Sequence, residues 1–165
     1  MSDPFATYPV VDEPAAAPVH DPIGLERYQF LRFLSQGGMG EVWLVEDQRL
    51  HCQVAMKVVG QAIRNSSAAI LRFQEEAQIT AQLSHPAIIP VHDLGTLADG
   101  RAYYTMPVVG GPRLADAIES WHRTGDHSGW TLRRLVDSFR MVCEAIAYAH
   151  SRSVIHRDLK PGNVM

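Results

Sequence analysis

The sequence has few of the features that mark secreted, membrane-spanning or nucleic-acid-binding proteins. Its two cysteines, Cys52 and Cys143, are too few for a disulfide framework and lack the spacing of metal ligands. No apolar run is long enough to cross a bilayer, and no basic stretch followed by an apolar core opens the chain. Basic residues adjoin only at Arg133-Arg134 and the net charge is −3, so no nucleic-acid partner is expected. These absences favour a cytoplasmic protein, and a membrane anchor beyond Met165 stays compatible with them.

What the sequence does contain is the composition of a globular domain, preceded by a segment rich in proline and alanine. Hydrophobic residues make up 46% of the 165-residue chain and charged residues 20%, which is ordinary for a folded protein. Residues 1–26 hold five of the ten prolines. Because proline removes a backbone donor and restricts the residue before it, we expect a disordered tail or linker there. A docking peptide is the alternative.

From Tyr28 onward, apolar periodicity predicts strands first and helices later. Strands are expected at 28–34, 41–45, 53–59, 88–94 and 101–106. Helices are expected from a cap at Ser66 or Ser67 to Leu83, at 114–122, and at 132–150 after a cap at Thr131. The last helix places its apolar residues on one face: Leu132, Leu135, Val136, Phe139, Val142, Cys143 and Ile146.

Residues 35–42 read S-Q-G-G-M-G-E-V and lie in the turn between the first two expected strands. Glycine at Gly37, Gly38 and Gly40 lets backbone amides approach phosphate oxygens where a Cβ would intrude. By itself this pattern is a weak signal, because glycine-rich hairpin turns are common. It resembles the glycine-rich loop of protein kinases, with Ser35 at the position of the first glycine.

The third expected strand carries V-A-M-K at 54–57, which resembles the V-A-I-K strand of the same family. Ala55 and Lys57 are two residues apart and therefore face the same side of a pleated strand. Alone, Lys57 could equally be a surface lysine on an edge strand, but the glycine loop upstream favours phosphate binding. Only one of Glu75 and Glu76 can face Lys57, because successive helical residues differ by about 100° in direction. The resemblance selects Glu76, which precedes an alanine, and leaves Glu75 as a solvated acid.

The strongest motif is V-I-H-R-D-L-K-P-G-N at 154–163, which fits the kinase catalytic loop H-R-D-L-x-x-x-N. It follows a matching lysine strand and glycine loop in the family's order, so a chance occurrence is negligible. A metal site built on His150 and His156 is not expected, because no acidic or thiol ligands accompany them.

From Tyr28 to its last residue the sequence is therefore similar to bacterial serine/threonine protein kinases of the eukaryotic type. The resemblance implies an α+β, protein-kinase-like fold. Its N-lobe, at 27–109, would be a five-stranded antiparallel sheet with one main helix. A partial, mainly helical C-lobe would follow at 110–165. The implied activity is ATP-dependent phosphorylation of serine or threonine hydroxyls on protein substrates, with ATP and Mg²⁺ as cofactors.

The resemblance also assigns roles to individual residues. Asp158 would orient or deprotonate the substrate hydroxyl, Lys160 would stabilise charge on the transferred phosphate, and Asn163 would bind the second Mg²⁺. Lys57, held by Glu76, would bind the α- and β-phosphates of ATP. The resemblance also places nine residues in the phosphate loop, the adenine pocket and the hinge: Gly37, Gly38, Gly40, Val42, Ala55, Lys57, Met106, Pro107 and Val109.

Members of this family also carry a metal-binding Asp-Phe-Gly segment, an activation loop and an Ala-Pro-Glu region downstream. None of these lies within the 165 residues, so we expect this chain alone to phosphorylate substrate negligibly. The alternative function is a non-catalytic module that binds nucleotide or a partner. The complete set of Lys57, Glu76, Asp158, Lys160 and Asn163 favours the kinase interpretation.

Overall fold

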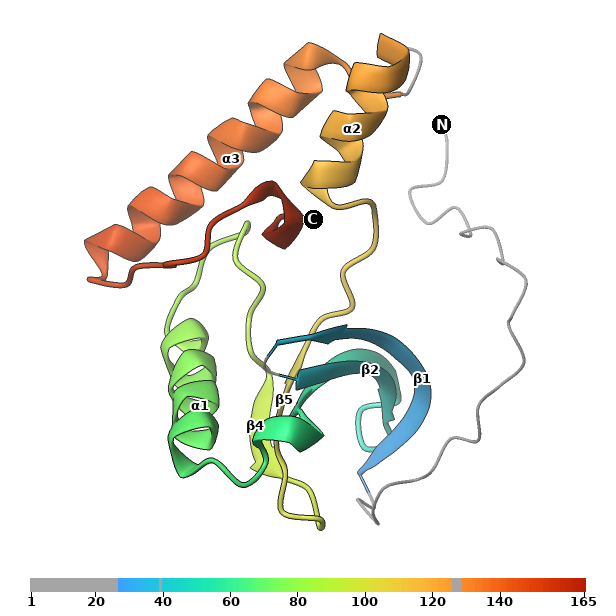
Figure 1. Cartoon of the computed structure of the whole chain (residues 1–165), viewed down its shortest axis with the longest axis vertical. Helices are drawn as coiled ribbons and strands as arrows, with labels where there is room; N and C mark the ends of the chain where they lie inside the picture. The colour runs from blue at the N-terminus through green and yellow to red at the C-terminus, as the bar shows by residue number, and fades with distance from the viewer. Residues whose placement is uncertain (1–26, 39, 126–128) are drawn as a thin grey trace.

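The structure, a computed structural model, describes residues 27–38, 40–125 and 129–165. The tail expected at 1–26 lies outside these described residues. A curled sheet with one helix against it forms one end of the described molecule, and a pair of helices forms the other (Figure 1). The C-terminal segment lies between the two ends in this view.

Five antiparallel strands form the sheet, in the order β1-β2-β3-β5-β4. Neighbours in this order pair throughout, so that β5 lies between β3 and β4. The strands are β1 (Tyr28–Gly37), β2 (Gly40–Asp47), β3 (Cys52–Val59), β4 (Asp93–Thr96) and β5 (Ala102–Met106). The five-stranded antiparallel sheet expected from the sequence is confirmed.

β4 begins later in the chain than expected, and the prediction of a strand over the whole of 88–94 is wrong. Pro90 has no backbone N–H to donate to a strand partner. The N–H of Ile88 is instead used in a turn, where it donates to the carbonyl of His85 at 3.0 Å. Val91 packs against the core beneath helix α1 (Ser67–Ala81), so part of this apolar run reflects packing rather than strand pairing.

Because side chains alternate along β3, its two faces belong to two hydrophobic clusters. Val54, Met56 and Val58 point into a cluster completed by Tyr28, Phe30, Val45, Leu97 and Tyr103. Val59 points to the opposite face, where the cluster is completed by Phe73, Ala77, Ala102 and Tyr104. The second cluster lies under helix α1, so it fixes that helix against the sheet.

The helices start at the caps that the sequence predicts. In α1 (Ser67–Ala81) the Ser66 hydroxyl accepts a hydrogen bond from the Ala69 amide at 3.3 Å. In α3 (Leu132–Ser151) the Thr131 hydroxyl accepts one from the Arg134 amide at 3.2 Å. These bonds satisfy amides that have no partner within the helix. The remaining helical elements are η1 (Gln61–Ile63), α2 (Leu114–Thr124) and η3 (Pro161–Asn163).

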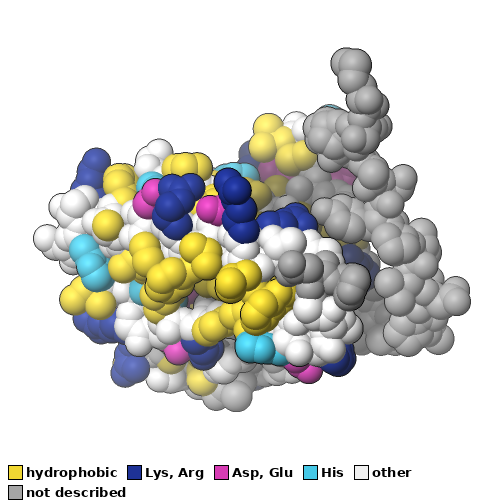
Figure 2. Space-filling view, turned by 90° about the horizontal axis from the view of Figure 1, so that it is seen from above, with side chains coloured by type: hydrophobic (Ala, Val, Ile, Leu, Met, Phe, Trp, Pro, Cys, Tyr) yellow, Lys and Arg dark blue, Asp and Glu magenta, His cyan; other side chains and the backbone are white. Residues whose placement is uncertain are grey.

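The buried residues of helix α3 are small, and several of its large apolar residues are exposed. Ala145 and Ala149 are buried, whereas Leu132, Val136 and Phe139 are 57, 56 and 63% exposed. These three residues, here termed the open stripe, recur at helical spacing on one side of the helix. Viewed from the end formed by α2 and α3, hydrophobic side chains gather in a band (Figure 2). No helix within the described residues is both long and apolar enough to cross a membrane.

Candidate active site

The sheet register gathers several of the predicted site residues on one face. Across β2 and β3, Val42 lies opposite Lys57, and across β3 and β5, Ala55 lies opposite Met106. Residues opposite each other in an antiparallel pair point to the same face. Val42, Ala55, Lys57 and Met106 therefore share a face, with Val42 and Lys57 nearer the glycine loop and Ala55 and Met106 further along the sheet.

Lys57 and Glu76 form an ion pair between β3 and helix α1. The Lys57 ammonium lies 3.0 Å from Glu76 Oε1, and the side chains are 21 and 43% exposed. Burial by itself lowers the pKa of Lys57, but the neighbouring Tyr104 and Glu76 outweigh burial, so its pKa lies above the ordinary value. Lys57 therefore stays cationic at neutral pH. Of the two adjacent glutamates, Glu76 is the one that meets Lys57.

Two aromatic side chains that the sequence reasoning did not single out surround this ion pair. The Lys57 ammonium lies 5.3 Å from the ring centre of Tyr104 and 5.7 Å from that of Phe73. The Tyr104 hydroxyl also donates to Glu76 Oε1 at 3.3 Å. Alternation along β5 places Tyr104 on the same face as Met106. That spacing is the signal by which Tyr104 could have been found.

The glycine loop joins β1 to β2, with Gly37 and Gly40 paired at its base. A Cβ on Gly40 would lie 2.1 Å from the carbonyl oxygen of Val58, so only glycine allows β2 to approach β3 this closely. A Cβ on Gly37 or Gly38 would meet no atom within 4 Å, so these two glycines border open space. Met39 lies outside the described residues.

The residues expected to form the hinge directly follow β5. Met106 is the last residue of this strand and is partly buried, and Pro107 and Val109 continue the chain outside any strand or helix. Pro107 has no N–H, so its backbone can offer only a carbonyl acceptor at this position. Val109 is 36% exposed and lies near the start of the connection to α2.

In the predicted catalytic loop, the side chains of Lys160 and Asn163 both bond to the carboxylate of Asp158. Lys160 Nζ lies 2.8 Å from Asp158 Oδ2, and Asn163 Nδ2 donates to the same oxygen at 3.1 Å. A second bond from Asn163 Nδ2 to the Asp158 carbonyl, at 2.8 Å, closes the loop on itself. Bonds from Lys160 and Asn163 hold the pKa of Asp158 below its ordinary value, so this carboxylate is ionised at neutral pH.

Two backbone features shape the catalytic loop and fix its end. Arg157 adopts a left-handed conformation with φ of 65°, which is uncommon for a residue with a side chain. After the η3 turn, the carbonyl of Val164 accepts a bond from the amide of Leu114 at 2.8 Å. The end of the loop is therefore fixed to the first residue of α2.

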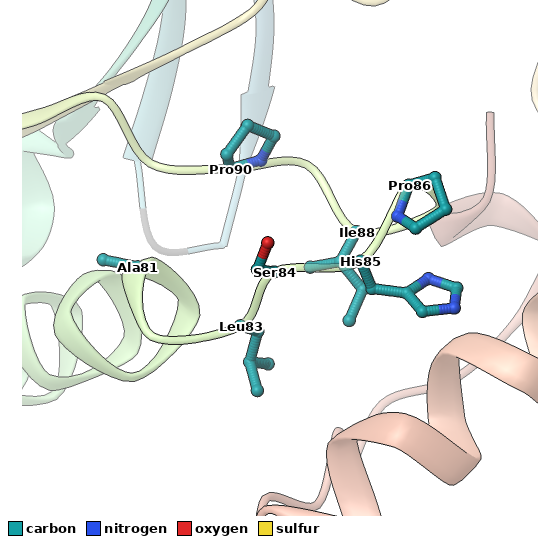
Figure 3. A pocket seen from close by; sticks show the side chains of 7 residues that line it. All are labelled: Ala81, Leu83, Ser84, His85, Pro86, Ile88 and Pro90. Carbon is teal, nitrogen blue, oxygen red and sulfur yellow. The ribbon is translucent and has the colours of Figure 1, made fainter.

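A second contact connects the segment after α1 with helix α3. The Ser84 amide donates to the Tyr148 hydroxyl at 3.0 Å, and the His85 ring lies 5.4 Å from the Tyr148 ring. The His85 side chain points toward α3 from the edge of an open hollow that is lined by residues between Ala81 and Pro90 (Figure 3). This contact joins the sheet end of the molecule to the helical end.

The site residues thus form two groups, Lys57–Glu76 on the sheet and Asp158–Lys160–Asn163 in the loop. In the part of the chain that the structure describes, no hydrogen bond or ion pair joins the groups directly. The C-terminal segment that carries the loop lies between the helical pair and the sheet in the view of Figure 1. A ligand that touches both groups would have to occupy the space between these two ends.

Comparison with known proteins matches this arrangement to one family. Residues 28–165 match the family model of the protein kinase domain. The chain belongs to the protein kinase family. The expected resemblance to bacterial serine/threonine kinases and the expected kinase-like α+β fold are confirmed. Protein kinases use ATP and divalent metal ions in phosphoryl transfer.

Two bacterial relatives and one bacterial crystal structure illustrate the match. Serine/threonine-protein kinase PknD of Protochlamydia amoebophila is 41% identical over 150 residues, which cover 87% of this chain and 15% of PknD. Serine/threonine-protein kinase PknA of Mycobacterium tuberculosis is 39% identical, covering 84% of this chain and 32% of PknA. A crystal structure of the PknI kinase domain of M. tuberculosis superposes with a TM-score of 0.65 at 31% identity, covering 86% of this chain and 55% of that one. This kinase sequence therefore spans only part of the length of each relative.

Proposed function

We propose that this chain supplies the nucleotide-binding lobe and the catalytic loop of a kinase that phosphorylates serine or threonine hydroxyls of proteins. The observation that carries the proposal is the convergence of Lys160 and Asn163 on the Asp158 carboxylate. Catalysis of phosphoryl transfer consists mostly of positioning and charge stabilisation. A carboxylate oriented by two hydrogen bonds beside a cation provides both.

The proposed roles follow from the charges in this loop. Asp158, kept ionised by its two neighbours, accepts a hydrogen bond from the substrate hydroxyl and then its proton. Lys160 is 57% exposed at its side chain, so its ammonium can reach negative charge on a phosphoryl group above the loop. Lysine two residues after the aspartate is typical of serine/threonine kinases, and the named relatives are serine/threonine kinases.

The sheet residues fit a nucleoside triphosphate. Lys57 offers a cation held by Glu76, and the open space beside Gly37 and Gly38 leaves room for phosphate oxygens near backbone amides. ATP, when bound, supplies the phosphoryl group that is transferred. The face proposed to receive adenine and the hinge beside it are formed by Val42, Ala55, Met106, Pro107 and Val109.

The residues present fit one part of a magnesium site. Among the described residues, no group of three or more His, Cys, Asp or Glu side chains could hold a metal by itself. Asn163 turns its Nδ2 toward Asp158, which leaves its amide oxygen on the other side as a hard ligand of the kind that Mg²⁺ prefers. We propose Asn163 as the ligand that this chain contributes. The Asp-Phe-Gly segment that supplies a further ligand in the family is not among the 165 residues.

We also propose that residues 27–109 act as the nucleotide-binding lobe and residues 110–165 as part of the substrate-binding lobe. The division falls where the sheet ends and the helical pair begins. A cytoplasmic location remains part of this proposal, because ATP and reduced thiols are both available there.

The first test uses titration calorimetry to measure nucleotide binding by the 165-residue chain. Magnesium-ATP is expected to bind, and Lys57→Met is expected to weaken binding by about tenfold, because the cation facing the phosphates is lost. Glu75→Gln is the matched control, since Glu75 is exposed and lies beside Glu76 without meeting Lys57. Equal affinities for all three proteins would contradict the proposed site.

The second test concerns phosphoryl transfer and begins with the DNA that follows the Met165 codon. If the reading frame continues through an Asp-Phe-Gly segment, its product is expected to label a generic protein substrate from γ-labelled ATP. Asp158→Asn should reduce this rate by about a thousandfold or more. The 165-residue chain should give negligible labelling. Binding of ATP without transfer by the extended product would favour the non-catalytic module instead.

A further inference from the structure

Tyr104 contacts both members of the Lys57–Glu76 ion pair from a third element of the fold. Its hydroxyl donates to Glu76 Oε1 at 3.3 Å, and that oxygen also accepts from the Lys57 ammonium at 3.0 Å. Its ring centre lies 5.3 Å from the Lys57 ammonium. Lys57 and Tyr104 are also direct partners in the pairing of β3 with β5. Strand β5 is thereby joined to both charged groups.

Tyr104 also joins β5 to helix α1 by aromatic packing. Its ring lies 5.1 Å from that of Phe73, which is fully buried and sits one helical turn before Glu76. Both rings belong to the hydrophobic cluster beneath α1. The same side chain therefore contacts the helix through its ring and the helix's glutamate through its hydroxyl.

We propose that Tyr104 is a positioning residue that holds Glu76, and through it the Lys57 ammonium, in the arrangement that receives the nucleotide phosphates. The consequence for nucleotide binding rests on the proposed function. The positioning itself depends only on the contacts among Tyr104, Glu76 and Lys57. It gives Tyr104 a role that none of the kinase motifs assigns to it.

The burial of the three side chains explains why such a residue is needed. Glu76 is 43% exposed at its side chain, so water competes with Lys57 for its carboxylate. Tyr104 is only 7% exposed, so its hydroxyl is fixed by the packing of the ring. A fixed donor restricts the carboxylate to one orientation. Without it, the carboxylate is free to turn toward water, and the partly buried Lys57 loses the partner that keeps its pKa high.

Tyr103 provides a matched control for any change at Tyr104. The two tyrosines are adjacent in β5 and each is 7% exposed. Tyr103 points to the opposite face of the sheet, where its ring packs against that of Tyr28 with centroids 5.8 Å apart. Tyr103→Phe therefore removes a hydroxyl from an equally buried aromatic residue and leaves the contacts of the ion pair unchanged.

The test is the rate at which an amine-reactive acetylating reagent modifies Lys57, measured by mass spectrometry on the 165-residue chain. The chain has only two lysines, so Lys160, which is 57% exposed, serves as an internal reference. Tyr104→Phe is expected to raise the Lys57 rate relative to Lys160 by about threefold, because a freed lysine is deprotonated more often. Glu76→Gln should raise it further, and Tyr103→Phe should leave it unchanged.

The double variant separates positioning from general loosening of the fold. If Tyr104 acts through Glu76, then Tyr104→Phe causes no further increase in the Glu76→Gln background. An equal increase in both backgrounds would overturn the proposal, as would no increase in either or an equal effect of Tyr103→Phe. Thermal unfolding of every variant shows whether the fold is kept at the temperature of the assay.

A reciprocal measurement serves if Tyr104→Phe does not fold. With 3-fluorotyrosine at position 104, the ¹⁹F resonance is expected to shift on Glu76→Gln, whereas a probe at position 103 should not respond. An unchanged resonance at 104 would overturn the proposal. Failure of the proposed function is distinguished by calorimetry, because an absence of magnesium-ATP binding by the unmodified chain leaves the acetylation result standing.

Discussion

The sheet with α1 and the pair formed by α2 and α3 bury apolar side chains very differently. The sheet region encloses large residues, including Met56, Val58 and Phe73, each at 0% exposure. Within the described part of α2 and α3, the buried residues are all alanines, namely Ala117, Ala145 and Ala149. The largest side chain of the open stripe, Phe139, is 63% exposed.

Because of this difference, the two ends contribute unequally to stability. Burial of a phenylalanine or leucine side chain stabilises a fold by about 1.5–3 kcal/mol, whereas one methyl group contributes about 0.8 kcal/mol. The sheet region therefore has a core of its own. The helical pair depends more on its few connections to the rest, such as the bond from the Ser84 amide to the Tyr148 hydroxyl. We expect the sheet region to unfold as the main cooperative unit.

The sharpest test of the contrast compares one phenylalanine from each region. Phe73→Ala should lower the free energy of unfolding by about 4 kcal/mol, because it leaves a cavity between α1 and the sheet. Phe139→Ala should change it by less than about 0.5 kcal/mol, since this side chain is already exposed. Urea unfolding of both variants measures these changes. Similar losses would mean that the open stripe is packed in solution, and the contrast would fail.

A smaller effect should come from the polar network at the start of the sheet. Asp47 is 2% exposed, accepts from Arg27 at 2.8 Å, and also accepts from the amides of Arg49 and Leu50. The Arg27 bond lowers the pKa of Asp47 despite burial, so ionised Asp47 stabilises the fold above its unfolded-state pKa of about 4. That stability is lost as the pH falls through the lower pKa of the folded state.

Asp47→Asn is therefore expected to cost about 2 kcal/mol at neutral pH and to flatten the acid side of the stability curve. Unfolding free energies measured between pH 7 and the acid limit of folding test both expectations. Glu46→Gln is the control, since Glu46 precedes Asp47 in β2 and is less buried. An Asp47→Asn curve parallel to that of the unmodified chain would show that this carboxylate does not link pH to stability.

The elements predicted correctly are those whose determinants are local in the sequence. Ser66 and Thr131 cap helices because a hydroxyl bonds an amide three residues later, which a sequence reveals directly. The start of β4 was not predictable in this way. Ile88 and Val91 have the apolar character of strand residues, but Pro90 between them and the turn at His85 prevent pairing.

The residues of the candidate site also fall into those that local sequence motifs predict and one that they do not. The meeting of Lys57 with Glu76 and the grouping of Lys160 and Asn163 around Asp158 follow motifs that the sequence displays. Tyr104 was missed because its place beside Lys57 depends on the register between β3 and β5, strands separated by η1, α1 and β4. A register of this kind is set by packing over a long stretch of chain and not by neighbouring residues.

The smallest expected effects come from the two helix caps, and they probe whether the regions unfold together. Ser66→Ala and Thr131→Ala each remove one similar bond, worth about 1 kcal/mol. If the sheet with α1 is the cooperative unit, Ser66→Ala lowers the thermal midpoint, whereas Thr131→Ala leaves it in place and speeds amide exchange in the first turn of α3 by about fivefold. Equal shifts of the midpoint would mean that α3 unfolds with the sheet. The contacts of Tyr148 with Ser84 and His85 would then be strong enough to join two differently packed regions into one unit.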